Sequence, residues 1–212
     1  MENNELNISQ WLQGFAGASP LEWLATLAGF LCVYLLIKRS IWSFVFGLIQ
    51  VSIYAWIFYS VKLYSDMLLH LFYIGFQFYG WYIWRQSQTS EGQVIVVKGD
   101  FGEYATWAAL ATLSSLILGY IMAHYTDASL PYADAFTTCT SLIAQWLLSR
   151  RKLFNWAFWI VVDLAAICIY WHKQLYPTSL LYLCFLVMAI IGQWQWYKSD
   201  TTEAARYKAR AA

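Results

Sequence analysis

The sequence predicts an all-α membrane protein with seven transmembrane helices, arranged as two parallel three-helix repeats joined by a central linker helix. Three observations lead to this prediction. Hydrophobic residues make up 60% of the 212 residues and charged residues 12%, against about 45–50% and 25% in soluble domains. Seven apolar runs follow one another, each near the length of a membrane-crossing helix. When the sequence is aligned with itself without gaps so that Arg39 matches Arg151, the first three runs match the last three.

Residues 1–20 are expected to lie at the membrane surface. They contain two acidic residues and no Lys or Arg, with a short amphipathic patch around Ile8, Trp11, Leu12 and Phe15. A cleavable signal peptide would need a basic region at its start, so an interfacial helix is the favoured interpretation of this segment.

The apolar runs divide the rest of the chain. The predicted spans cover residues 21–37, 41–60, 66–84, 104–124, 134–149, 153–171 and 177–197. Prolines stand at or just before the first, fifth and seventh spans, where a missing N–H costs little. Residues 86–100 are polar apart from Val94 to Val97 and are predicted to form the one long loop. The expected divisions are a first repeat at 21–85, a loop and linker helix at 86–133, a second repeat at 134–197 and a tail at 198–212.

The charges predict the orientation in the membrane. Segments on the side of the N-terminus hold only Lys62 and Lys173, whereas segments on the other side hold the remaining 11 Lys and Arg. Because basic loops stay in the cytoplasm, the N-terminus is expected outside and the C-terminus inside. The net charge of +1, without a basic stripe interleaved with aromatic residues, argues against nucleic acid as a partner.

The internal repeat rests on matching residues at span ends and glycine positions. We call two residues equivalent when this alignment matches one with the other. Equivalent pairs are Glu22 with Asp134, Leu35-Leu36 with Leu147-Leu148, Arg39 with Arg151, Phe46 with Phe158, Tyr64 with Tyr176, Gly80 with Gly192 and Trp84 with Trp196. Chance matching of leucine-rich helices is the alternative. Because a single span separates the halves, both repeats enter the membrane from the same side. In transporters built from parallel repeats, the substrate lies near the midplane between the repeats.

The sixth span carries the strongest candidate site. Asn155, Trp159 and Asp163 follow at i, i+4 and i+8, so they share one helix face. Asp163 lies roughly 15 Å along a helix that starts near Leu153, close to the middle of a ~30 Å hydrocarbon core. A carboxylate there costs about 2.5 to 3.5 kcal/mol, and such groups usually face a cavity or a partner.

Other spans add amides and aromatic rings. Gln77 and Trp81 share a face of the third span, and the fifth span carries Gln145. A Gln inside a span either belongs to a polar site or hydrogen-bonds to a neighbouring helix. Trp84 and Trp196, at the ends of the third and seventh spans, are expected in an interfacial aromatic belt. Tryptophan planes attract cationic rings, so the candidate face suits a flat, cationic or polar aromatic solute.

These residues resemble a known family. The pattern Asn155-Trp156-x-x-Trp159-x-x-x-Asp163, the element Gln77-x-x-Gly80-Trp81-x-x-Trp84 and the layout of three, one and three spans are similar to the PnuC-type nicotinamide riboside transporters. The resemblance covers roughly residues 21–197. It implies a SWEET-like fold, a homotrimer, and facilitated diffusion of nicotinamide riboside across a bacterial inner membrane, with phosphorylation in the cytoplasm trapping the vitamin.

The resemblance also implies site residues. The family's substrate-binding positions correspond to Gln77, Trp81, Asn155, Trp159 and Asp163, and also to Gln145 and Trp194. Related members that take thiamine, another flat cationic vitamin, share the layout, so the vitamin is left open. The terminal segments of this chain are short for the family.

Other classes of function fit the sequence less well. A membrane-embedded enzyme would need a catalytic set, and no zinc motif, nucleophile elbow or second intramembrane acid accompanies Asp163. A retinal-type photoreceptor would need a lysine in the seventh span, which has none. Ion-coupled uptake stays an alternative, because Asp163 alone could relay a proton. We expect no cofactor and no metal.

Overall fold

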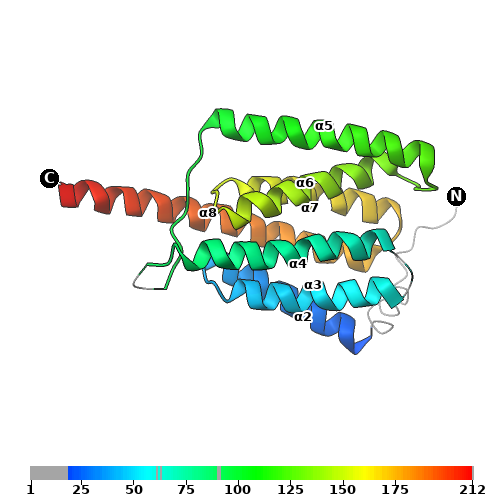
Figure 1. The fold of residues 1–212 in the computed structure, drawn as a ribbon, viewed down its shortest axis with the longest axis horizontal. Helices are drawn as coiled ribbons and strands as arrows, with labels where there is room; N and C mark the ends of the chain where they lie inside the picture. Colours follow the sequence, from blue (N-terminus) through cyan, green and yellow to red (C-terminus); the bar gives the residue numbers. More distant parts are fainter. Residues whose placement is uncertain (1–18, 61, 63, 90–91, 212) are drawn as a thin grey trace, which may run out of the picture.

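The structure is a computed structural model, and it describes residues 19–60, 62, 64–89 and 92–211. These residues form seven α-helices (Figure 1), which are α2 (Pro20–Ile37), α3 (Ser43–Ser60), α4 (Tyr64–Arg85), α5 (Phe101–Tyr125), α6 (Pro131–Ser149), α7 (Asn155–His172) and α8 (Tyr176–Ala211). The predicted interfacial segment lies outside the described residues except for Ser19, which caps α2, and Pro20, which begins it.

Five of these helices are long and apolar enough to cross a membrane, namely α2, α3, α5, α7 and the part of α8 up to Ser199. The chain is therefore a multi-pass membrane protein. The two helices that fall short are α4 and α6, which carry Gln77 and Gln145 and pack against each other. A helix that neighbouring helices shield from lipid can hold polar side chains, because those side chains contact protein.

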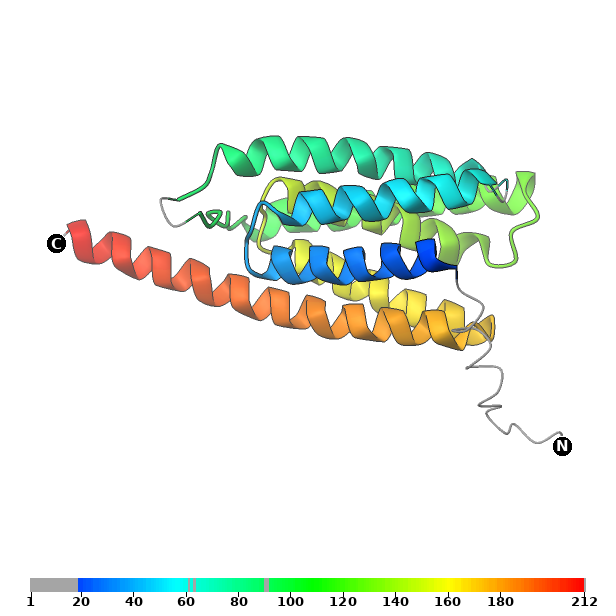
Figure 2. The ribbon, with the colours of Figure 1, turned by 90° about the horizontal axis from the view of Figure 1, so that it is seen from below.

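The helices pack as two groups of three. In the first group, α3 packs against α2 and α4, and in the second group α7 packs against α6 and α8. The groups meet where α4 contacts α6 and where α2 contacts α8, while α5 packs on α6. Figures 1 and 2 show α8 extending past the other helices at the end where residues 86–100 connect α4 to α5. We call this end the loop end and the opposite one the far end.

Two buried tryptophans join the groups near the loop end. The indole Nε1 of Trp84 donates to the carbonyl oxygen of Leu148 at 3.1 Å, and that of Trp196 donates to the carbonyl oxygen of Leu36 at 3.0 Å. The two donors are equivalent residues, and so are the two acceptors. The exposed fractions of the two tryptophans are 0% and 1%. The prediction of an interfacial belt was therefore wrong for both, because each indole N–H has a protein carbonyl as its partner.

Two glycines allow close packing at equivalent positions. A Cβ on Gly80 would collide with the ring of Phe44, and a Cβ on Gly192 would collide with the ring of Trp156. Phe44 and Trp156 are themselves equivalent. The absence of a side chain at each glycine lets the third helix of its group approach the second.

The connections between helices repeat in the same way. Arg39 and Arg151 have φ values of 57° and 62°, and Lys62 and Gln174 have values of 62° and 58°. Each residue follows the end of a helix, where a left-handed residue lets backbone N–H groups satisfy the last carbonyls. Arg39 N, for example, donates to Leu36 O at 2.9 Å, and Arg151 N donates to Leu148 O at 2.8 Å.

The predicted loop at residues 86–100 is present, whereas the predicted tail is part of a helix. Residues 86–100 form a long connection, as predicted, but Val94 and Val96 are buried with exposed fractions of 2% and 7%. The predicted seventh span and tail are one helix, because α8 continues without a break from Tyr176 to Ala211. No proline or glycine follows Gly192 to end it.

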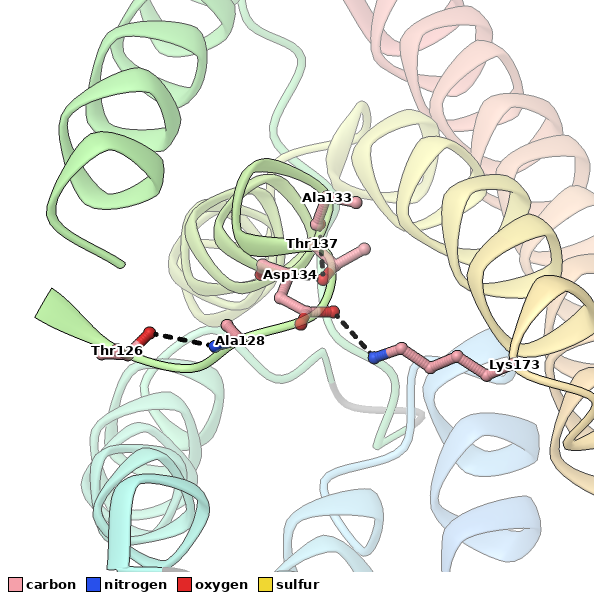
Figure 3. A network of polar contacts seen from close by, with 6 residues as sticks. All are labelled: Thr126, Ala128, Ala133, Asp134, Thr137 and Lys173. Carbon is pink, nitrogen blue, oxygen red and sulfur yellow. Dashed lines mark hydrogen bonds and ion pairs between the residues drawn. The ribbon is translucent and has the colours of Figure 1, made fainter. Parts of the chain in front are cut away.

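A surface ion pair links the start of α6 to the end of α7 at the far end (Figure 3). Lys173 Nζ lies 3.5 Å from Asp134 Oδ1, with side chains 30% and 33% exposed. The pair joins the first turn of α6 to the connection between α7 and α8, both within the second group. Such exposed pairs stabilise a fold by about 0 to 1 kcal/mol, so this contact contributes little to stability.

Candidate functional site

Asn155 is the first residue of α7 and is fully buried. Its Nδ2 donates to the carbonyl oxygen of Lys152 at 2.7 Å, which ties the helix start to the preceding turn. Its Oδ1 is buried and has no hydrogen-bond partner among the described residues. A buried amide oxygen without a donor costs about 1 to 3 kcal/mol, so it is available to accept a hydrogen bond from a ligand.

Asp163 lies two turns further along the same face, with an exposed fraction of 4%. Within the part of the chain that the structure describes, its carboxylate makes no hydrogen bond and no ion pair. A buried charge that lacks a partner is expensive in a membrane protein. This arrangement suits a ligand that brings a positive charge or hydrogen-bond donors.

Trp159 stands between these two residues and is half-buried. Its side chain packs against two hydrophobic clusters, one that draws residues from both groups, such as Leu36 and Leu148, and one around Ile143 and Phe158 of the second. The ring therefore lies where the two groups meet. An aromatic plane at that place can stack on a flat solute.

Gln77 is buried on α4, with an exposed fraction of 8%. A Cβ on Gly47 would lie 2.6 Å from its Nε2, so the amide fits against the bare backbone of α3. Gln77 and Trp81 line one pocket of about 190 Å³, together with Phe44, Val45, Leu48 and Phe78. Trp81 is more open, at 39% exposed, and the Arg85 guanidinium lies 5.3 Å from its ring centre.

A second pocket, of about 210 Å³, lies at the loop end beside α5 and α6 and contains none of the predicted site residues. It is lined by Glu103, Trp107, Trp146, Leu147, Arg150 and Lys152. Its Lys152 ammonium is already paired with Glu103 at 2.8 Å. The charges of this pair therefore partly neutralise each other, whereas the α7 carboxylate has no ion-pair partner among the described residues.

Gln145 is buried on α6, with an exposed fraction of 6%. One turn earlier, Ser141 Oγ lies 2.7 Å from the hydroxyl oxygen of Tyr73, and this hydrogen bond joins α6 to α4. Tyr73 was missed in the sequence. The signal was its spacing, since Tyr73, Gln77 and Trp81 follow at i, i+4 and i+8 on one helix face.

Trp194 lies apart from the other predicted residues. Its side chain is 62% exposed on α8, and the Lys198 ammonium lies 5.4 Å from its ring centre. The structure thus buries Gln77, Gln145, Asn155 and Asp163, half-buries Trp159, and leaves Trp81 and Trp194 more open. Among the described residues, no group of three or more His, Cys, Asp or Glu side chains could hold a metal ion.

Apolar helices around buried amides and a buried carboxylate define a multi-pass membrane protein with a polar site inside its helices, as expected of a transporter. Comparison with known proteins makes the class more specific. Residues 19–198 match the family described as nicotinamide mononucleotide transporter, and the chain belongs to this family.

Relatives and a solved structure agree with this membership. The nicotinamide riboside transporter PnuC of Neisseria mucosa is 32% identical over 209 residues, covering 89% of this chain and 80% of the relative. The protein of the same name from Escherichia coli K12 is 26% identical over 219 residues, covering 90% and 92%. A crystal structure of the vitamin B3 transporter PnuC superposes with a TM-score of 0.74 at 28% identity, covering 93% of this chain and 88% of that one. These similar proteins are transporters and not enzymes.

Proposed function

We propose that this chain carries nicotinamide riboside across a bacterial inner membrane by facilitated diffusion. The observation that carries the proposal is the buried Asp163 carboxylate, which has no hydrogen-bond or ion-pair partner among the described residues and lies one turn from Trp159. Nicotinamide riboside has a flat pyridinium ring with a positive charge and a ribose with hydroxyl groups. The ring would stack on Trp159, with Asp163 as its countercharge.

The same charge distribution favours the riboside over the mononucleotide for which the family is named. The mononucleotide carries a phosphate, which needs basic side chains or backbone N–H groups around it. The proposed binding residues are Gln77, Gln145, Asn155, Trp159 and Asp163, with Trp81 at the edge, and none of them is basic. A buried carboxylate would repel the phosphate.

The amides would bind the polar parts of the vitamin. The Asn155 oxygen lacks a donor within the described structure and can accept from a hydroxyl group or a carboxamide. Gln77 and Gln145 offer both donors and acceptors from the helices where the two groups meet. Trp194 is left out of the proposed site because its side chain is 62% exposed on α8.

Passive transport is the proposed mechanism because the sequence has no Walker A motif and no second acid that accompanies Asp163 in its span. Coupling to protons is the second candidate, since a lone intramembrane carboxylate can relay a proton. Thiamine is the second candidate substrate, because it is also flat and cationic.

We further propose that the two groups are parallel repeats of a SWEET-like fold, and that the chain assembles as a homotrimer. The paired contacts of Trp84 and Trp196 support the repeat, since equivalent atoms bond across the groups in both directions. The trimer rests on the resemblance to the family. Light scattering of the purified protein should give the mass of three chains, and the mass of one or two chains would contradict it.

The proposed orientation places the loop end in the cytoplasm. At this end, Lys38, Arg85, Arg150 and Lys198 each lie over the ring of the aromatic residue one turn earlier, at 5.9, 5.3, 4.9 and 5.4 Å. An excess of basic residues is typical of the cytoplasmic side, and aromatic rings are typical of either membrane interface. A fluorescent protein that folds only in the cytoplasm should glow when fused to the C-terminus, and a dark fusion at normal expression would contradict the orientation.

One experiment tests substrate and mechanism together. Purified protein is titrated with nicotinamide riboside, its mononucleotide, thiamine and riboflavin, and the fluorescence of its 13 Trp reports binding. Proteoliposomes then receive labelled riboside without any gradient. We expect the riboside to bind most tightly and to equilibrate across the membrane. Preference for the mononucleotide would contradict the substrate, and accumulation that a protonophore abolishes would contradict passive transport.

A further inference from the structure

The connection between α4 and α5 crosses the loop end and contacts both groups of helices. We call residues 93–97 the latch segment. Val94 and Val96 are buried, at 2% and 7% exposed. Both belong to the hydrophobic cluster that contains Trp84 from the first group and Trp196 from the second. The latch segment is therefore part of the packing between the groups rather than a loose loop.

The latch segment forms hydrogen bonds to the first group, mostly with Arg39. Val94 N donates to the carbonyl oxygen of Arg39 at 3.2 Å, and Arg39 Nη1 donates to the carbonyl oxygen of Val94 at 3.3 Å. Arg39 Nη2 also donates to Gln93 Oε1. The latch segment follows α4 closely in the chain, and Ile95 N donates to Ser87 O at 3.3 Å. These contacts hold it on the first group.

Its other side bonds to the second group through the equivalent arginine. Val97 N donates to the carbonyl oxygen of Arg151 at 2.9 Å, and Leu153 N donates to the carbonyl oxygen of Val97 at 3.0 Å. Arg151 Nη1 donates to the carbonyl oxygen of Ile95 at 3.2 Å. Two arginines at equivalent positions of the two groups thus bind neighbouring parts of one short segment.

The backbone of these arginines suits their places just after the ends of α2 and α6. Both have φ in the left-handed region, at 57° and 62°, where glycine is the usual residue because it has no Cβ. Lys62 and Gln174 have the same conformation at the far end. The left-handed backbone is therefore common to connections at both ends, and what distinguishes the two arginines is the contacts of their side chains. At the loop end, the two guanidinium groups contact the latch segment.

We propose that the latch segment closes the loop end between the two groups, and that it must separate from Arg151 and Leu153 for substrate to leave at this end. The inference rests on the proposed transport between the groups. Relative motion of the groups at the loop end would break bonds on one side of the segment. The segment bonds to Ser87, just after α4, and to Arg39, and we place the separation on the side of Arg151 and Leu153.

The first test locks the latch segment onto the second group. Val97 and Lys152 form a parallel backbone bridge, and paired residues of neighbouring strands lie close enough for a disulfide. Val97→Cys and Lys152→Cys are combined in a background where the four native cysteines are replaced by alanine. The oxidised protein should transport nicotinamide riboside at least about ten-fold more slowly than the reduced protein, while its affinity for the riboside stays the same.

The controls separate the latch from the proposed function. Each single cysteine variant should be insensitive to the oxidant. Equal transport by the reduced and the fully disulfide-linked protein would overturn the latch while leaving the transport function intact. If neither the native chain nor the cysteine-free parent binds and transports the riboside, the proposed function is overturned, and the latch with it.

A second test does not depend on forming a disulfide. The rate at which a maleimide labels Val96→Cys reports how often the buried position opens, and Ile95→Cys, at a residue that is 45% exposed, gives the rate of an open position. Arg151→Gly removes the guanidinium and suits the left-handed backbone, so the variant should fold. Labelling at position 96 should become about five-fold faster, the factor expected for one lost hydrogen bond.

Gln174→Gly is the matched control for this substitution. It makes the same change at a left-handed position of the far end, where no latch segment is bound. Labelling at position 96 should keep the parent rate in this variant. An unchanged rate in Arg151→Gly, or an equal increase in Gln174→Gly, would overturn the assignment.

Discussion

The two groups of three helices share their framework and differ on the faces that we propose to bind substrate. Trp84 and Trp196 make the same indole-to-carbonyl hydrogen bond, and Gly80 and Gly192 face an aromatic ring in the same way. Equivalent residues thus determine how the helices pack. The packing of one group can be inferred from the other, provided that the residue types match.

At the proposed site the equivalent positions hold different residues. Trp159 corresponds to Gly47, and Asp163 corresponds to Val51. Gly47 has no side chain, and the Gln77 amide lies against it. In the first group, an amide from α4 thus lies where the second group has an aromatic side chain. Two groups with a similar framework can thus carry an unequal site, with the carboxylate and the Trp159 ring on the second group.

The largest expected effect concerns the shared tryptophans. Trp84→Ala and Trp196→Ala each remove a fully buried ring and an interhelical hydrogen bond, and each should lower stability by about 3 to 5 kcal/mol. Thermal unfolding in detergent should show similar shifts for both variants. A large loss in one and little change in the other would break the equivalence of the two groups.

The shared glycines should give the next largest effect. Gly80→Ala and Gly192→Ala would drive a Cβ into the rings of Phe44 and Trp156, and each should cost about 1 to 3 kcal/mol. Gly75→Ala is the control, because no atom lies within 4 Å of a Cβ built there. That variant should be as stable as the parent or slightly more stable, and a loss comparable to the other two would contradict the packing argument.

The residues that differ between the groups should affect binding rather than folding. Trp159→Ala should remove about 1 to 2 kcal/mol of riboside binding, or roughly five- to thirty-fold in affinity, and Asn155→Ala should cost a similar amount. Calorimetric titration measures both. Trp56→Ala removes a 61% exposed ring from α3 and should leave the affinity as it is. Unchanged affinity in both site variants would refute the proposed site.

Asp163→Asn should affect binding no more than Trp159→Ala does, and it gives the sharpest contrast between ligands. It should weaken the cationic riboside about ten-fold, or about 1.4 kcal/mol, and spare a neutral analogue of the same shape. Val51→Ala, at the equivalent position of the first group, should change neither affinity. Equal losses for both ligands in Asp163→Asn would mean that the carboxylate holds helices together and does not bind the charge.

The membrane class, the long loop and the helix locations could be predicted from the sequence, because hydropathy and periodicity act locally along the chain. It also indicated the α7 face, since Asn155, Trp159 and Asp163 are separated only by helical spacing. Identities at a constant separation, such as Arg39 with Arg151, were enough to predict the repeat. Nothing in these patterns required knowledge of which helices touch.

Only the tertiary structure decided what each side chain faces. Trp84 and Trp196 stand at span ends, where an aromatic belt and a buried contact look identical in sequence, and the packing of the two groups buried them. Trp194, in the same span as Trp196, is mostly exposed because a helix turns about 100° per residue and two positions add to about 200°. The use of Val94 and Val96 as contacts between the groups also depends on residues far apart in the chain, whose meeting no local pattern encodes.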